Sequence, residues 1–163
     1  MAQEGTVQTA GFTADGNQYL TFALGQEEYG VEILRVQEIK GYSAITPIPN
    51  APVYLKGVMN LRGTVVPVVD LRAKFSMAAA EYDKFTVVIV VTVGARVFGL
   101  VVDAVSDVVN LPEDKIEPAP ELGDGIDTSF LRGMARAGEK FVLLLDIERV
   151  LGNRELVEAS AAA

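Results

Sequence analysis

Alternating apolar and polar positions divide much of the chain into short strands. The residues from Tyr19 to Leu24 alternate, Gly25 to Glu28 supply a turn, and the alternation resumes from Tyr29 to Ile33, which predicts a β-hairpin. Later apolar runs are rich in β-branched residues and too short for core helices; they cover residues 65–71, 85–93, 96–102 and 140–145. The pattern therefore predicts a mainly β chain.

Short helices are expected directly after Asp70, Pro112, Asp127 and Asp146, because these residue types favour helix starts. Residues 1–17 are polar and follow neither a strand nor a helix period, so we expect a flexible N-terminal tail. Residues 153–163 are expected to form a C-terminal helix or tail that ends in alanines.

The two halves of the chain repeat one pattern. Residues 25–39 align with residues 94–108, an offset of 69 that superposes both glycine pairs and the apolar positions between them. The offset rises to 71 where residues 45–49 meet 116–120, and to 76 where residues 55–57 meet 131–133. Matching order and spacing indicate an internal duplication, with an inserted loop near residues 123–129 in the second copy.

A repeat of about 70 residues made of short strands buries its edges best by curling into a small barrel. We therefore predict two barrels, at approximately residues 18–84 and 85–152, with few and short helices. Each barrel would leave one apolar face uncovered. The two are expected to share a hydrophobic layer between them.

Composition excludes much chemistry. The chain has no cysteine and no histidine, which removes thiolate and imidazole nucleophiles and the common zinc and copper sites. Its formal net charge of −8 disfavours nucleic acid and acidic membrane surfaces as partners. The apolar runs are too short to cross a bilayer and no signal segment is evident, so we expect a soluble cytoplasmic protein without a metal or cofactor.

The duplication separates residues that the fold needs from residues that serve a function. Asp70 and Asp146 occur in both copies and are predicted to be helix N-caps. Four glycines also recur and are predicted at turns or bulges that need a backbone without a Cβ atom: Gly25, Gly30, Gly94 and Gly99. Asp103 and Asp107 are interpreted as part of a solvated acidic surface, since no calcium-loop pattern surrounds them.

Arg62 has no like counterpart in the second copy, and the segment EIKG at 38–41 has the unlike counterpart DVVN at 107–110. Arg62 and Gly63 separate two strand-like runs, so Gly63 is expected to take a positive φ in a turn that lifts the guanidinium out of the barrel. On the residues alone, Arg62 is either an anchor for a partner protein or an ordinary exposed charge.

Several motifs together resemble the CheW family of chemotaxis coupling proteins, from about residue 18 to residue 151. They are GQEEYG at 25–30, VQEI at 36–39, KGV at 56–58, NLRG at 60–63, VVPVVDLR at 65–72 and VVDAVSDV at 101–108. The resemblance implies two intertwined five-stranded SH3-like barrels and no catalysis. It also implies binding to the cytoplasmic tips of chemoreceptors and to the regulatory domain of the histidine kinase CheA, at membrane-associated receptor arrays.

The family's receptor surface lies in a groove between the barrels, and the resemblance carries it over to particular residues. They are Arg62, Glu38, Val36, Gly57 and Asn60, together with Gly99, Val105 and Val108, whose repeat partners allow the fold alone to require them. The resemblance assigns no particular residue to the kinase contact.

Two other functions fit the residues. A generic β-barrel module of another signalling pathway would share the fold and differ in its partner. An acid–base enzyme would use paired carboxylates such as Asp103 and Asp107, in a pocket that gives them unlike pKa values.

Overall fold

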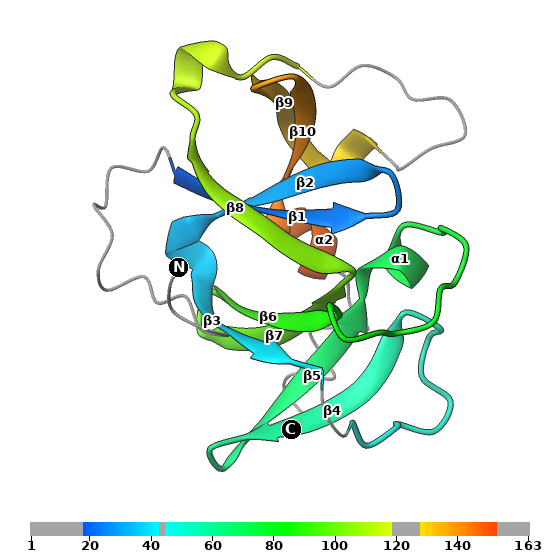
Figure 1. The fold of residues 1–163 in the computed structure, drawn as a ribbon. Coiled ribbons are helices and arrows are strands. Elements are labelled where there is room, and N and C mark those ends of the chain that lie inside the picture. The colour runs from blue at the N-terminus through cyan, green and yellow to red at the C-terminus, as the bar shows by residue number, and fades with distance from the viewer. Residues whose placement is uncertain (1–17, 43–44, 119–127, 153–163) are drawn as a thin grey trace.

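The computed structural model describes residues 18–42, 45–118 and 128–152, and it confirms a mainly β chain with short helices (Figure 1). The predicted tails at 1–17 and 153–163 lie outside the described residues. The strands are β1 (Gln18–Leu24), β2 (Glu27–Glu32), β3 (Val36–Gly41), β4 (Leu55–Leu61), β5 (Thr64–Asp70), β6 (Val87–Val93), β7 (Arg96–Val102), β8 (Ala104–Asn110), β9 (Leu131–Ala137) and β10 (Lys140–Leu145). The helices are α1 (Leu71–Lys74) and α2 (Ile147–Leu151), with 3-10 turns η2 (Ile33–Arg35), η3 (Glu113–Lys115) and η4 (Thr128–Phe130).

These strands form two five-stranded sheets, each the basis of a small SH3-like barrel. Barrel A has the strand order β8-β1-β2-β10-β9, and barrel B has the order β3-β6-β7-β5-β4. In Figure 1 the strands of barrel A lie above those of barrel B. The prediction of two five-stranded barrels with few helices is confirmed.

The barrels do not coincide with the predicted divisions at 18–84 and 85–152. After the β1–β2 hairpin the chain crosses into barrel B, and after the β6–β7 hairpin it crosses back into barrel A. Each half thus supplies strands to both barrels. The reason is hydrogen bonding: β2 finds a parallel partner in β10 and β7 finds one in β5, so neither half can complete its own ladder.

The duplication survives in this exchanged arrangement. Replacing each strand of barrel A by its repeat partner reproduces the strand order of barrel B. The register agrees as well, since Gly30 faces Leu144 in barrel A and the equivalent Gly99 faces Val68 in barrel B. The two barrels are therefore structural copies built from interleaved halves.

Three apolar clusters make up the core. One cluster lies inside barrel B and includes Val66, Val68 and Val90, and a second lies inside barrel A and includes Tyr19 and Leu144. The largest cluster draws residues from both sheets, among them Leu20, Phe22, Ile89, Leu100 and Leu143. It is the predicted layer between the barrels, and successive strand residues alternate between it and a barrel interior.

The four repeated glycines serve two purposes. Gly25 and Gly94 have φ values of 63° and 61° in the hairpin turns, as predicted. Gly30 and Gly99 instead lie within strands, so the prediction of turns or bulges is wrong for them. A Cβ atom on Gly99 would come within 2.8 Å of Val88, which shows that crowding between strands excludes a side chain there.

The two predicted helix caps are confirmed. The Asp70 carboxylate accepts a hydrogen bond from the Ala73 N–H, and Asp146 accepts one from the Arg149 N–H, each at 3.3 Å. Asp70 ends β5 and Asp146 directly follows β10, and each starts a short helix whose apolar side joins the shared layer.

Leu100 tests whether the shared layer unites the barrels. It is fully buried in that layer, so Leu100→Ala should lower the free energy of unfolding by about 2–5 kcal/mol. Urea unfolding followed by circular dichroism and tyrosine fluorescence should still give one coincident transition. Two separate transitions would show instead that the barrels are independent units.

Candidate functional site

The β4–β5 hairpin ends in a two-residue turn that presents Arg62. Leu61 pairs with Thr64, and the intervening Arg62 and Gly63 have φ values of 51° and 90°. A positive φ at both central residues matches the twist of the flanking strands, and the predicted positive φ of Gly63 is confirmed. Asn60 stabilises the turn, since its side-chain oxygen accepts a hydrogen bond of 2.9 Å from the Gly63 N–H.

Arg62 forms an ion pair with Glu38 of β3. The Arg62 side chain is 64% exposed and that of Glu38 is 15% exposed. The guanidinium therefore lies in solvent, while the glutamate side chain that pairs with it is largely buried. The hydrogen bond from Arg62 holds the pKa of Glu38 below its ordinary value. Since β3 and β4 are the outer strands of the sheet, the pair links the two edges of barrel B.

A pocket of about 200 Å³ opens beside this ion pair, and we call it the barrel B mouth. Its described lining residues all belong to barrel B: Gln37, Leu61, Arg62, Thr64, Val66 and Val97. Leu61 and Val66 are buried members of the barrel interior. The mouth therefore combines an apolar floor with a charged rim.

Barrel A has a matching pocket of about 220 Å³ with different chemistry. Ser106, Ala137, Lys140 and Val142 line it, and they are the repeat partners of Gln37, Leu61, Thr64 and Val66. The partner of Glu38 is Asp107, whereas no arginine takes the place of Arg62. The barrel A pocket has its own, longer ion pair, between Lys140 and Glu28 at 4.0 Å. The arginine and its paired carboxylate, and not the presence of charge, therefore distinguish the two mouths.

The remaining predicted receptor residues of barrel B are buried. Val36 starts β3 and is 2% exposed in the shared layer. Gly57 lies at a bulge of β4 with a φ of 146°, where a Cβ atom would fall 2.0 Å from the Thr46 carbonyl oxygen. Together with Gly99, they build the scaffold that holds Glu38 and the Arg62 turn.

Val105 and Val108 lie on β8 of barrel A and are partly buried against the shared layer. The structure thus separates the predicted set. Arg62, Glu38 and Asn60 meet at the barrel B mouth, while Val36, Val105 and Val108 belong to or pack on the layer between barrels.

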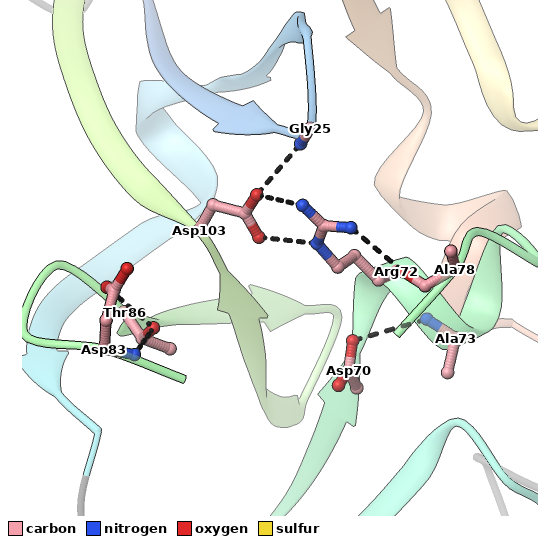
Figure 2. A network of polar contacts seen from close by, with 8 residues as sticks. All are labelled: Gly25, Asp70, Arg72, Ala73, Ala78, Asp83, Thr86 and Asp103. Atoms are coloured by element: carbon pink, nitrogen blue, oxygen red, sulfur yellow. Dashed lines mark hydrogen bonds and ion pairs between the residues drawn. The ribbon is translucent and has the colours of Figure 1, made fainter. Parts of the chain in front are cut away.

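Asp103 is not part of a solvated acidic surface, and that prediction is wrong. Figure 2 shows its carboxylate between the Gly25 N–H, at 2.9 Å, and the Arg72 guanidinium, which donates two hydrogen bonds of 2.8 and 2.6 Å. The hydrogen bonds from Arg72 lower the pKa of Asp103. Asp107 turns its carboxylate to the Val108 N–H instead, so the two aspartates have separate partners.

The motifs do not reveal the role of Asp103, although the sequence carries a signal for it. Asp103 aligns with Leu34 in the first copy, so it satisfies the same criterion of unlike repeat partners that identified Arg62. Gln37, Thr64 and Val97 were also missed as mouth residues, because their neighbourhood depends on how the barrel edges meet.

Within residues 18–42, 45–118 and 128–152, no group of three or more acidic side chains is placed to hold a metal ion. Over the same ranges, no helix has the length and apolar character needed to cross a membrane.

Two strand-exchanged five-stranded barrels, each with a pocket at its mouth, define the class of fold to which the chain belongs. A family model for the CheW-like domain matches residues 18–155. The chain therefore belongs to the CheW-like domain family.

Named relatives agree over nearly the whole length. The chemotaxis protein CheW of Klebsiella aerogenes is 47% identical over 156 residues, which cover 96% of this chain and 94% of the relative. The chemotaxis protein CheW of Rhizobium meliloti is 39% identical, covering 88% and 92%. The crystal structure of the scaffolding protein TtCheW from Thermoanaerobacter tengcongensis has a TM-score of 0.79 and 31% identity, covering 88% and 92%. This chain is accordingly an adaptor of chemotaxis signalling.

Gly57 is predicted to be a structural residue. Gly57→Ala should lower the free energy of unfolding by about 1–3 kcal/mol through the strained φ alone, and the clash with Thr46 adds to this loss. Gly41→Ala is the matched control, because a Cβ atom there meets nothing within 4 Å. Equal thermal midpoints for the two variants would contradict this assignment.

Proposed function

We propose that this chain is a non-catalytic scaffold that links the cytoplasmic tips of chemoreceptors to the regulatory domain of the histidine kinase CheA. It would act in the cytoplasm, at membrane-associated receptor arrays. The observation that carries the proposal is the Arg62–Glu38 pair, which marks one of two equivalent barrel mouths in a member of the CheW-like family.

The barrel B mouth suits the side of a receptor helical hairpin. Leu61 and Val66 form the buried base of the pocket, the partly exposed Val97 lines it, and Arg62 offers an exposed guanidinium already oriented by Glu38. Arginine is frequent among interface hot spots because it combines a bidentate donor fork with a long apolar stem. A partner that presents an apolar helical stripe beside a carboxylate would complement both features.

Two unlike barrels provide a physical route for coupling. Barrel A has a different mouth and different edge strands, which leaves it available to a second partner. A receptor that prefers one scaffold geometry in one signalling state would shift the equilibrium of the bound kinase. The size of that shift is limited by the difference in receptor affinity for the two geometries.

Catalysis finds little support in the chain's chemistry. The chain lacks histidine and cysteine, and the Asp103 carboxylate is occupied by Arg72 and Gly25. The proposal therefore rests on binding alone, and a binding assay with a structural control decides it.

Arg62→Ala should weaken receptor binding without unfolding the chain. Arg62 is exposed at a turn tip, so its loss should leave the circular dichroism spectrum and thermal midpoint near wild type. Affinity for a receptor cytoplasmic fragment should fall by at least about tenfold, as expected for a hot-spot arginine. Arg96→Ala, another exposed arginine at a hairpin turn of barrel B, is the matched control.

Co-sedimentation with receptor-bearing membranes, with and without the kinase, measures both contacts. Receptor binding that is unchanged in Arg62→Ala would remove Arg62 from the interface. Absence of binding to receptor and kinase by the unaltered chain would favour a barrel module of another pathway.

A further inference from the structure

The chain passes between the barrels at two places, and both carry an ion pair. The first crossover is η2, between β2 and β3, and it contains Arg35. The second is Asp103, the single residue between β7 and β8. Among the described residues, Asp103 pairs with Arg72 of α1 and Arg35 pairs with Glu148 of α2.

The helix members of these two pairs are repeat equivalents of opposite charge, and their partners lie one position apart in the two crossovers. Arg72 and Glu148 occupy the same position, two residues after the capping aspartates Asp70 and Asp146. Asp103 aligns with Leu34, and Arg35 is the next residue along the chain. A helix-borne cation meets a crossover anion at one site, and the reverse holds at the other. Both repeats therefore have an ion pair between the short helix and the crossover, but the positive and negative partners have changed places.

The Arg72–Asp103 pair joins elements of both barrels. Arg72 follows β5 of barrel B, whereas Asp103 also accepts the Gly25 N–H from the β1–β2 turn of barrel A (Figure 2). Arg72 donates a further hydrogen bond of 2.9 Å to the Ala78 carbonyl oxygen, which fixes the guanidinium from its other side. The side chains of Arg72 and Asp103 are 18% and 31% exposed, so water screens the pair only in part.

The second pair is weaker. Arg35 reaches Glu148 through one contact of 3.0 Å, and the Glu148 side chain is 61% exposed. Its helix, α2, follows β10 of barrel A and contacts β6 of barrel B. This pair therefore lies at the same kind of boundary, with less geometric restraint.

We propose that Arg72 and Asp103, assisted by Arg35 and Glu148, are positioning residues that fix the angle between the two barrels. The shared apolar layer holds the barrels together, but burial of apolar area is not directional. A two-pronged guanidinium–carboxylate contact is directional and resists rotation. The consequence for signalling rests on the proposed function: a displacement at the barrel B mouth reaches barrel A only while this angle is fixed.

The absence of native cysteine allows a direct test in the full-length chain. Nitroxide labels are attached at Ala95→Cys, in the β6–β7 turn of barrel B, and at Glu139→Cys, in the β9–β10 turn of barrel A; both positions are exposed. Pulsed electron paramagnetic resonance then measures the distribution of distances between barrels without any partner. Asp103→Asn removes the charge with little change of shape, and Arg72→Lys keeps a charge but removes the fork.

Both variants should broaden the distance distribution, and Arg72→Lys combined with Asp103→Asn should broaden it no further than Asp103→Asn alone. Arg149→Leu is the matched control, because its partners Asp146 and Ser129 lie beside the same helix and do not join the barrels. A distance distribution as narrow as that of the wild type in both variants would overturn the proposal. This holds even if the thermal midpoint is lowered, because the pair would then stabilise the fold without fixing the angle between the barrels. If Asp103→Asn does not fold, Glu148→Gln at the exposed pair provides the same readout.

The signalling consequence has its own measurement. In receptor-bearing membranes with the kinase, Asp103→Asn should co-sediment like wild type, while the change in kinase activity between receptor signalling states should fall about tenfold. An undiminished change would overturn this part of the proposal. Failure of the unaltered chain to bind receptor would refute the proposed function and leave the spectroscopic result standing.

Discussion

The layer of apolar side chains between the two sheets is the constraint on which the structure depends. Each sheet has one face inside its barrel and one face on this layer, so strands such as β7 and β10 are apolar on both sides. Because each half of the chain supplies strands to both barrels, the layer cannot open without breaking hydrogen-bonded ladders. The apolar layer and the exchange of strands therefore both hold the two barrels together.

The two copies have diverged at particular places on this common frame. The barrel mouths are equivalent in position, yet only the mouth of barrel B, among the described residues, carries an arginine paired with a carboxylate. The crossovers are equivalent as well, yet their ion pairs have opposite polarity. Divergence has thus changed charged side chains at the mouths and crossovers while the strand order remained that of the repeat.

Local features were predictable because their causes lie within a few residues. The Asp70 and Asp146 caps, the Gly25 turn and the Arg62–Gly63 hairpin all follow from propensities and spacing. The repeat offsets also gave the number of barrels and the layer between them, because apolar positions recurred in register. Strands and their faces were therefore accessible from the sequence.

Contacts between distant residues were not predictable in the same way. Parallel pairing of β2 with β10 and of β5 with β7 leaves no turn signal, so the strands that the halves exchange could not be identified from the residues, although the family resemblance implied intertwined barrels. Asp103 was misread because its partner Arg72 is 31 residues away. The crowding at Gly57 was missed because the carbonyl that excludes a side chain there belongs to Thr46. In each case the decisive neighbour comes from another strand or turn.

The most direct test of the account is amide NMR of the full chain titrated with a soluble receptor cytoplasmic fragment. If the charged mouth of barrel B is the receptor site, the largest changes in amide chemical shift should occur at Gln37, Glu38, Arg62 and Gly63. The amides of the β9–β10 turn should keep their chemical shifts. Shift changes concentrated in the β9–β10 turn, with those four amides unmoved, would contradict it.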